Sequence, residues 1–436
     1  MRQSLRLGIY LGALVVASAL ASSLQAGETG IRKQVLDLNR VTGQDAILDK
    51  VRSLLGQEKL SKELVAQGAE IAGEKDSPLH YNGAIILAQL AVEYNDLPAA
   101  EKLFRVGMKE GAKLQSSKKL LESYGGLIDA FYEHKKFEDA ARICKELIDL
   151  KTDDGKPRIV MISVATRFNE FDFIEDDSFD TAKRLRPAVH RLLIQAMSKQ
   201  GKYDQALQLV EQMIKTNDHW MERQLKGWVL REAGKFEDAA TIYEDILSRI
   251  NKDANLPAED KEEYQERYRY TLSNIYVDMK KIDRASEQLL KLLELRPEEP
   301  GYNNDLGYIW ADNDIKLEEA EKLIRKALDL DRQRRKTGKV APGEDRDNGA
   351  YLDSLGWVLF KKKQFKEAKD VLIKAVEDKR NQHIEIYDHL GDVHMALGEK
   401  EQAVAAWKRG LEFVGEGRRE SDRKAAVEKK LQLHAK

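Results

Sequence analysis

The sequence predicts an all-α fold, a linear array of about eight helix pairs with further helices at both ends. Gly and Pro, which interrupt helices, occur only 28 and 8 times in 436 residues. Charged residues make up 34% of the chain and mix with Leu and Ala at the spacing of amphipathic helices. A short turn followed by an alanine recurs eight times, which indicates an internal repeat. The length exceeds what one compact core usually spans, and an array accounts for it.

Residues 1–26 are expected to be a signal peptide. Arg2 and Arg6 precede an apolar run over residues 7–20, and Ala26 supplies a small residue at the exit. The pattern predicts a periplasmic or secreted protein whose mature chain starts at Gly27. The alternative is an N-terminal membrane anchor, because the apolar run is near the length that spans a bilayer.

Residues 27–80 are expected to form an N-terminal helical cap. Apolar residues recur at helical spacing over 46–55 and 61–71, so two helices are predicted there. They would cover the open end of the array, since terminal repeats need a polar outer face.

The repeat is marked by an alanine that follows a turn at the start of the second helix of each pair. The aligned residues are Ala100, Ala140, Ala206, Ala239, Ala285, Ala320, Ala368 and Ala403. In most pairs a small residue next to a Leu lies on the first helix, before this alanine, as Gly356 does before Ala368. Two antiparallel helices approach closely where both present small side chains, so Gly356 and Ala368 are expected to touch.

These residues resemble the tetratricopeptide repeat, whose pattern places Leu-Gly, Tyr, Ala and an aromatic at fixed steps. The matching positions are Leu355, Gly356, Leu359, Ala368 and Leu372 in one unit, and Leu390, Gly391, His394, Ala403 and Trp407 in the next. The resemblance covers about residues 81–417, and Ile128 and Ile194 depart from it by replacing the small residue. It implies a superhelical solenoid of helix pairs.

The array divides into blocks separated by breaks in the repeat. Residues 81–154 hold two units, and residues 155–186 are expected to be an insertion with an extra helix and a loop. Residues 187–417 hold six more units, interrupted by a charged loop at 333–348 that is expected to be mobile. Residues 418–436 are expected to form a C-terminal capping helix. This tail carries seven Lys or Arg against three acids, which indicates a solvated face or, alternatively, a docking patch.

No pattern of catalytic or metal-binding residues is present in the sequence. Phosphate loops, nucleophile elbows and paired Cys motifs are absent, so the chain is expected to be no enzyme and to need no cofactor. His389 and His394 lie on different faces of one helix, which argues against a metal site. The single cysteine, Cys144, has the neighbours of a buried structural thiol. Basic and acidic residues nearly cancel, 73 against 75, so nucleic acid is not an expected partner.

The resemblance also implies a binding groove, lined by residues of the first helix of each pair. The candidate positions are Trp228, Arg231, Tyr270, Asn274, Asn304, Tyr308, Asp353, Trp357, Asp388 and Asp392. Large aromatic side chains in such a groove are typical binding anchors. The alternative for Trp228 and Trp357 is that they pack between neighbouring helices. Aromatic residues surrounded by Asp suit a basic or apolar partner segment.

The expected function is that of a non-enzymatic scaffold or adaptor for other proteins. The last three units look like the C-terminal module of exported bacterial tetratricopeptide proteins, some of which are adaptors or assembly factors of the cell envelope. The alternative is a structural envelope protein that associates with itself. Contact with a membrane is expected only if the signal is retained as an anchor.

Overall fold

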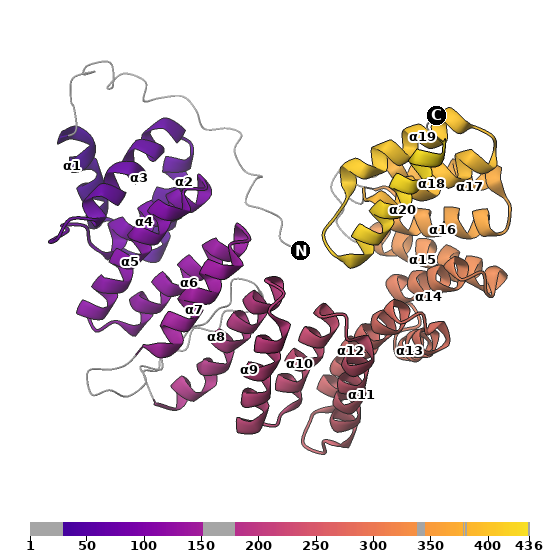
Figure 1. Ribbon diagram of the computed structural model, residues 1–436, viewed down its shortest axis with the longest axis horizontal. Coiled ribbons are helices and arrows are strands. Elements are labelled where there is room, and N and C mark those ends of the chain that lie inside the picture. Colours follow the sequence, from indigo (N-terminus) through magenta and orange to yellow (C-terminus); the bar gives the residue numbers. More distant parts are fainter. Residues whose placement is uncertain (1–28, 151–178, 338–344, 378, 380–381, 435–436) are drawn as a thin grey trace. The chain divides into compact units, whose positions relative to one another are not determined.

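The computed structural model describes residues 29–150, 179–337, 345–377, 379 and 382–434 (Figure 1). Within these ranges every regular element is a helix, as predicted. The predicted signal peptide and residues 155–178 of the predicted insertion lie outside them. None of the helices in these ranges combines the length and the apolar character that crossing a membrane requires. The chain divides into two compact units, Met1–Leu209 and Val210–Lys436.

The first unit begins with short helices that precede the repeats. Two of them, α2 (Gln44–Leu55) and α3 (Glu58–Ala72), lie where the sequence predicted helices, whereas α1 (Thr29–Asp37) was not predicted. A 3-10 turn over Leu38–Arg40 follows α1. Two helix pairs follow, α4 (Tyr81–Glu93) with α5 (Leu97–Lys113) and α6 (Ser117–Glu133) with α7 (Phe137–Asp149). Helices α8 (Phe179–Lys199) and α9 (Tyr203–Thr216) come next along the chain, and the unit boundary falls within α9.

The second unit continues with helix pairs and ends on a single helix. Its elements are α10 (Trp220–Glu232), α11 (Phe236–Lys252), α12 (Ala258–Asp278), α13 (Ile282–Leu295), α14 (Pro300–Asp312), α15 (Leu317–Thr337), α16 (Gly349–Lys361), α17 (Phe365–Glu377), α18 (Ile384–Ala396), α19 (Lys400–Gly410), η3 (Leu411–Phe413) and α20 (Arg418–His434). Each predicted unit between residues 220 and 417 contains one of these pairs.

Two predicted breaks are partly helical. Helix α8 starts at Phe179, inside the predicted insertion, and α15 continues to Thr337, inside the predicted loop. Ion pairs stabilise the added turns of α15. Arg334 Nη2 lies 3.0 Å from Glu299 Oε2, and Arg335 Nη2 lies 3.0 Å from Asp347 Oδ1. The charged composition that suggested a loop therefore forms a salt-bridged helix end.

The repeat alanines lie in the packed interior of the helix pairs. All eight are completely buried, as the alignment predicted. The predicted contact between Gly356 and Ala368 stays a prediction, whereas a Cβ at Gly356 would meet Leu372 Cγ at 2.4 Å. The small residue thus makes room for the side chain four residues after the alanine. The same relation joins Gly227 to Tyr243, Gly307 to Ile324 and Gly391 to Trp407.

The turn inside each pair has one recurring backbone geometry. The first helix ends on a residue with positive φ, which is Gly at Gly201, Gly234 and Gly398 and a longer residue at Lys135, Lys280 and Lys363. The N–H of the next residue then bonds the carbonyl five residues earlier, as Lys136 does with Phe131 at 2.7 Å. This bond satisfies a carbonyl that the helix end would leave unpaired.

The lone cysteine lies inside the first unit, as predicted. Cys144 is fully buried on α7. Burial, together with the charge of Asp129, raises the pKa of its thiol to about 12. It therefore stays a thiol at neutral pH and behaves as a small apolar side chain.

Candidate functional site

The first helices of the second unit carry the predicted groove residues, and α20 lies across them. Helix α20 packs against α18 and α19 (Figure 1). Arg419, Arg423, Val427 and Lys430 recur at helical spacing, so one side of α20 presents all four. This side faces acidic residues of α12 and α18.

An apolar contact fixes the middle of α20. Val427 is fully buried and packs with Ile384, Ala403 and Trp407 of the last helix pair. Leu431 adds a partly buried side chain to the same cluster, whereas Leu433 is 66% exposed. One fully buried aliphatic residue is a small apolar contribution for a helix of this length.

Ion pairs on both sides of Val427 bind α20 to α18. Arg423 Nη1 lies 3.1 Å from Asp388 Oδ2, and the same guanidinium donates to Glu385. Lys430 Nζ lies 2.6 Å from Asp388 Oδ1 and 2.6 Å from Asp392 Oδ1. The prediction of a wholly solvated tail is therefore wrong for Arg423 and Lys430. Charge-assisted hydrogen bonds of this kind are among the stronger polar contacts in proteins.

The N-terminal end of α20 reaches an earlier repeat. Arg419 Nε lies 2.6 Å from Asp278 Oδ1, and its Nη2 donates to the carbonyl of Asn274 at 3.0 Å. The predicted groove residue Arg231 also approaches this carboxylate, with 3.9 Å between its Nη2 and Asp278 Oδ2. Helix α20 thus joins α18 to α12 across the groove positions.

A second polar layer lies behind the ion pairs. Asp353 Oδ1 accepts a hydrogen bond from His389 Nδ1 at 2.9 Å, and both side chains are buried. The His389 ring stacks on Trp357 with 4.0 Å between centroids, and Tyr308 lies on it at 6.3 Å. The Tyr308 hydroxyl donates to Glu385 at 2.6 Å. The layer therefore connects directly to the carboxylate that Arg423 contacts.

Trp357 does not lie on a solvated surface, in contrast to the predicted anchor. Only 8% of it is exposed, and its indole N–H donates to Asp312 at 3.0 Å. Asp353 is likewise buried, with 3% exposed. Of the two interpretations of Trp357, packing between neighbouring helices is the one that the structure shows. Both residues therefore lie in the packed interior of the helix pairs.

Burial and neighbouring charges shift the protonation of this cluster. Burial disfavours the charged form of His389, but the charge and hydrogen bond of Asp353 and the charge of Glu385 outweigh it, so its pKa is raised. Burial also opposes ionisation of Glu385, yet His389 and Arg423 hold its pKa below the usual value. Burial and the charge of Asp388 raise the pKa of Asp392, although Lys430 opposes this. Ionisation of Glu385 and Asp392 is therefore favoured by the neighbouring cations and opposed by burial.

The remaining predicted residues lie along α10, α12 and α14. Tyr270 is 39% exposed and donates to Asp305 at 2.9 Å. Asn304 is 7% exposed and donates to the same residue at 3.3 Å. Trp228 is partly buried, and Asn274 reaches α20 through its backbone. Tyr270 is thus the exposed aromatic among the predicted positions.

Sequence reasoning missed Glu385 and Asp278, which both contact α20. Glu385 precedes Asp388 by three residues and Asp392 by seven, so all three carboxylates share one face of α18. Asp278 follows Asn274 by four residues on α12. Both could have been found by extending the groove stripe one turn along each helix.

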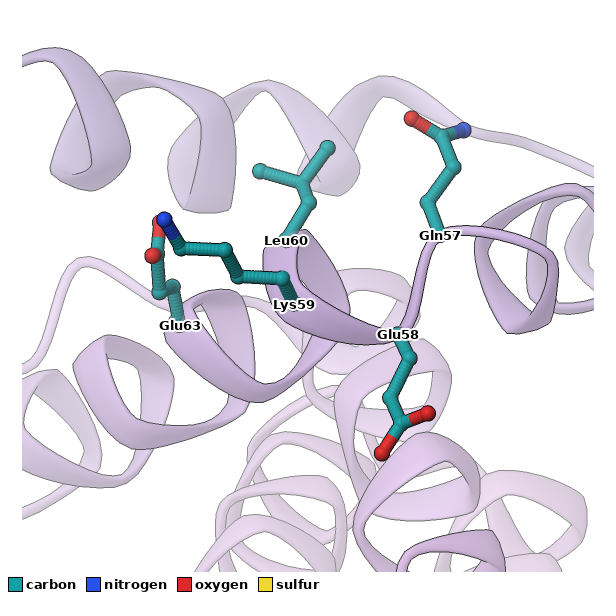
Figure 2. A pocket seen from close by; sticks show the side chains of 5 residues that line it. All are labelled: Gln57, Glu58, Lys59, Leu60 and Glu63. Carbon is teal, nitrogen blue, oxygen red and sulfur yellow. The ribbon is translucent and has the colours of Figure 1, made fainter.

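The described residues offer little to catalysis or metal binding. In them no group of three His, Cys, Asp or Glu side chains is placed to hold a metal ion. A shallow hollow at the start of α3 is lined by Gln57, Glu58, Lys59, Leu60 and Glu63 (Figure 2). Glu58 points to the opposite side from Gln57 and Leu60, whereas the charged ends of Lys59 and Glu63 lie close together (Figure 2).

Comparison with known proteins identifies the repeats. Models of the tetratricopeptide repeat match residues 192–255 and 266–299, and a model of the PPR repeat matches residues 122–151. A search of curated proteins gave no match.

Solved structures of repeat proteins are similar at low sequence identity. A tetratricopeptide repeat protein from Parabacteroides merdae is 14% identical, with 74% of this chain and 100% of that chain covered and a TM-score of 0.47. A thermophilic protein of this type from Thermus thermophilus is 17% identical, covering 48% and 98%, with a TM-score of 0.35. MamA from Desulfovibrio magneticus is 19% identical, covering 45% and 96%, with a TM-score of 0.34. The matched models identify tetratricopeptide repeats at residues 192–255 and 266–299, and the described helices form an all-helical array of the same type.

Proposed function

We propose that this chain is a non-enzymatic scaffold or adaptor that binds basic segments of other proteins through the first helices of residues 210–436. One observation carries the proposal: a basic helical face is seated on Asp278, Asp388 and Asp392. Tetratricopeptide repeats act as protein-binding modules, which supports a protein as the partner.

The chemistry of this surface favours a cationic partner. Its carboxylates accept hydrogen bonds from Arg and Lys at 2.6–3.1 Å, and bonds between charged groups are stronger than neutral ones. The exposed Tyr270 can add apolar contact beside them. Nucleic acid is not proposed as a ligand, because its phosphates would meet carboxylates.

We also propose that the protein works in the cell envelope, in the periplasm or outside the cell. This proposal rests on the charged, apolar and small residues of the N-terminal segment. A scaffold in that compartment needs no disulfide, since Cys144 is buried and the repeats supply the packing.

Site-specific photo-cross-linking in the native cells tests where partners bind. A photoreactive phenylalanine replaces Tyr270 on α12 or, as a control of similar exposure (39% and 41%), Ile373 on the second helix α17. We expect a defined cross-linked protein at position 270, weakened as salt rises, and none at position 373. Cross-links at position 373 alone would show that partners dock outside the proposed surface.

A further inference from the structure

We infer that α20 is a resident ligand of the groove, and that a partner binds by replacing it with a basic amphipathic helix of its own. This inference rests on the proposed function and specifies both the class of partner and the regulation of its binding. Three features of the structure support it: the composition of the α20 contact, the link that tethers α20, and the charges that remain when α20 leaves.

The contact of α20 has the composition of a bound peptide helix. Each basic side chain on this face forms an ion pair with one or two carboxylates of the repeats. The pairs are Arg419 with Asp278, Arg423 with Glu385 and Asp388, and Lys430 with Asp388 and Asp392. Its apolar part is centred on Val427. By comparison, the paired helices of each repeat bury a continuous stripe, as α16 does with nine buried residues. A helix held mainly by ion pairs is easier to release than one held by the core.

The other basic residues of α20 make different contacts. Arg418 lies over the Phe236 ring of α11, 5.3 Å from its centroid. Lys424 and Lys429 are exposed, and Lys424 lies 3.8 Å from Glu428 of α20 itself. Lys424 and Lys429 therefore form an outward set, distinct from the groove-facing Arg423 and Lys430. The outward set supplies a matched control for the groove-facing one.

A short link joins α20 to the last repeat. Residues 414–417 connect η3 to α20, and Gly417 has φ +114°, a conformation that other residues rarely adopt. A Cβ at Gly417 would meet nothing within 4 Å, whereas Val414 at the other end of the link packs against the cluster around Val427. Glu420 reaches back to the backbone N–H of Gly415 at 3.0 Å. The link allows α20 to leave while it stays tethered nearby.

The groove without α20 would need another cation. Glu385, Asp388 and Asp392 share one face of α18, and Arg423 and Lys430 are the cations that contact them. Removing both cations would leave three neighbouring carboxylates in a partly buried place, which is unfavourable. A replacing helix must therefore present two Arg or Lys residues seven positions apart with an apolar residue four after the first, as α20 does.

A tethered ligand limits its competitors by mass action. Short tethers give effective concentrations in roughly the millimolar range. A competitor then sees only the fraction of molecules whose groove is open, and its apparent affinity falls in proportion. Weakening α20 without changing the groove should therefore strengthen binding of a free basic helix.

The test uses the full chain and, as the probe, a fluorescent peptide with the sequence of residues 417–436. Arg423→Ala/Lys430→Ala weakens the resident helix, and Lys424→Ala/Lys429→Ala removes the same charge from its outward face. Fluorescence anisotropy measures peptide affinity, and hydrogen exchange of the α20 amides measures its release. We expect faster exchange and about tenfold or more tighter peptide binding in the first variant, with wild-type behaviour in the second.

Each other outcome overturns the inference in a different way. Unchanged exchange in Arg423→Ala/Lys430→Ala would show that its ion pairs do not hold α20. Equal peptide affinity in all three chains would show an open groove with no resident ligand, while leaving the proposed function intact. Released α20 without peptide binding would show that the groove does not accept basic helices, which would remove the proposed function as well.

Discussion

Replacing Gly356 by Ala tests the packing rule that relates each small residue to the side chain four positions after the repeat alanine. The added Cβ would lie 2.4 Å from Leu372 Cγ and 2.8 Å from Leu372 Cδ2. Attractive carbon contacts lie at roughly 3.5–4.0 Å, so Leu372 must move by about an ångström or the helices must separate. Leu372 is fully buried and has no open space to enter.

Two opposing terms set the size of the effect. Overpacking a filled core costs about 1–3 kcal/mol, whereas exchanging Gly for Ala inside a helix stabilises by about 1 kcal/mol. The difference between the two terms is about 0–2 kcal/mol. Because the added Cβ would lie only 2.4 Å from Leu372 Cγ, the upper half of this range is expected, a loss of about 1–2 kcal/mol in the free energy of unfolding. For a unit of this size that lowers the melting temperature by roughly 2–8 °C.

Thermal and denaturant melts followed by circular dichroism provide the assay. Gly125→Ala is the matched control, because a Cβ at Gly125 meets nothing within 4 Å, and it should stabilise the chain by up to about 1 kcal/mol. The double variant Gly356→Ala/Leu372→Ala should lose less stability than the two single losses added together, since the cavity accepts the new methyl group. A Gly356→Ala chain as stable as wild type would refute the packing rule.

Two further predictions concern protonation and export. The raised pKa of His389 means that its protonated form contributes stability below the ordinary histidine pKa of about 6.5, and that this contribution is lost as pH rises through the raised pKa. An NMR titration of its imidazole should therefore give a midpoint above the ordinary value in wild type and a lower one in Asp353→Asn; a midpoint at or below the ordinary value in wild type would contradict the assignment. N-terminal sequencing of the native protein should start at Gly27, and a Met1 start in a soluble cytoplasmic fraction would contradict export.

The repeat architecture was predictable because its contacts are local. The two helices of a pair are adjacent in the sequence and pack against each other, so the pattern of small and large residues recurs with the repeat itself. The eight alanines are buried as predicted, from Ala100 to Ala403. The close approach of Leu372 to Gly356 was harder to predict, because the alignment marks which positions are small but not which side chain lies nearest to each of them.

The repeat pattern in the sequence could not predict which helices α20 packs against. Arg419 and Asp278 are 141 residues apart, and nothing in a local pattern pairs positions so distant. The sequence predicted a groove suited to a basic or apolar segment and, separately, a basic tail, with nothing to join the two. Trp357 was predicted as an exposed anchor for a related reason, because the repeat pattern places it toward the groove while Asp312 and His389 cover it.

The recurring turn inside each pair gives the array an uneven resistance to opening. An L-residue in the left-handed conformation costs roughly 1–2 kcal/mol relative to its preferred conformations, and glycine avoids that penalty. Pairs closed by Lys135, Lys280 and Lys363 therefore start from a less favourable turn than those closed by Gly201, Gly234 and Gly398. In a linear array each repeat is stabilised by its neighbours alone, so such differences stay local. Amide hydrogens beside the lysine turns should then exchange first, and the choice of a single turn residue tunes one repeat without altering the others.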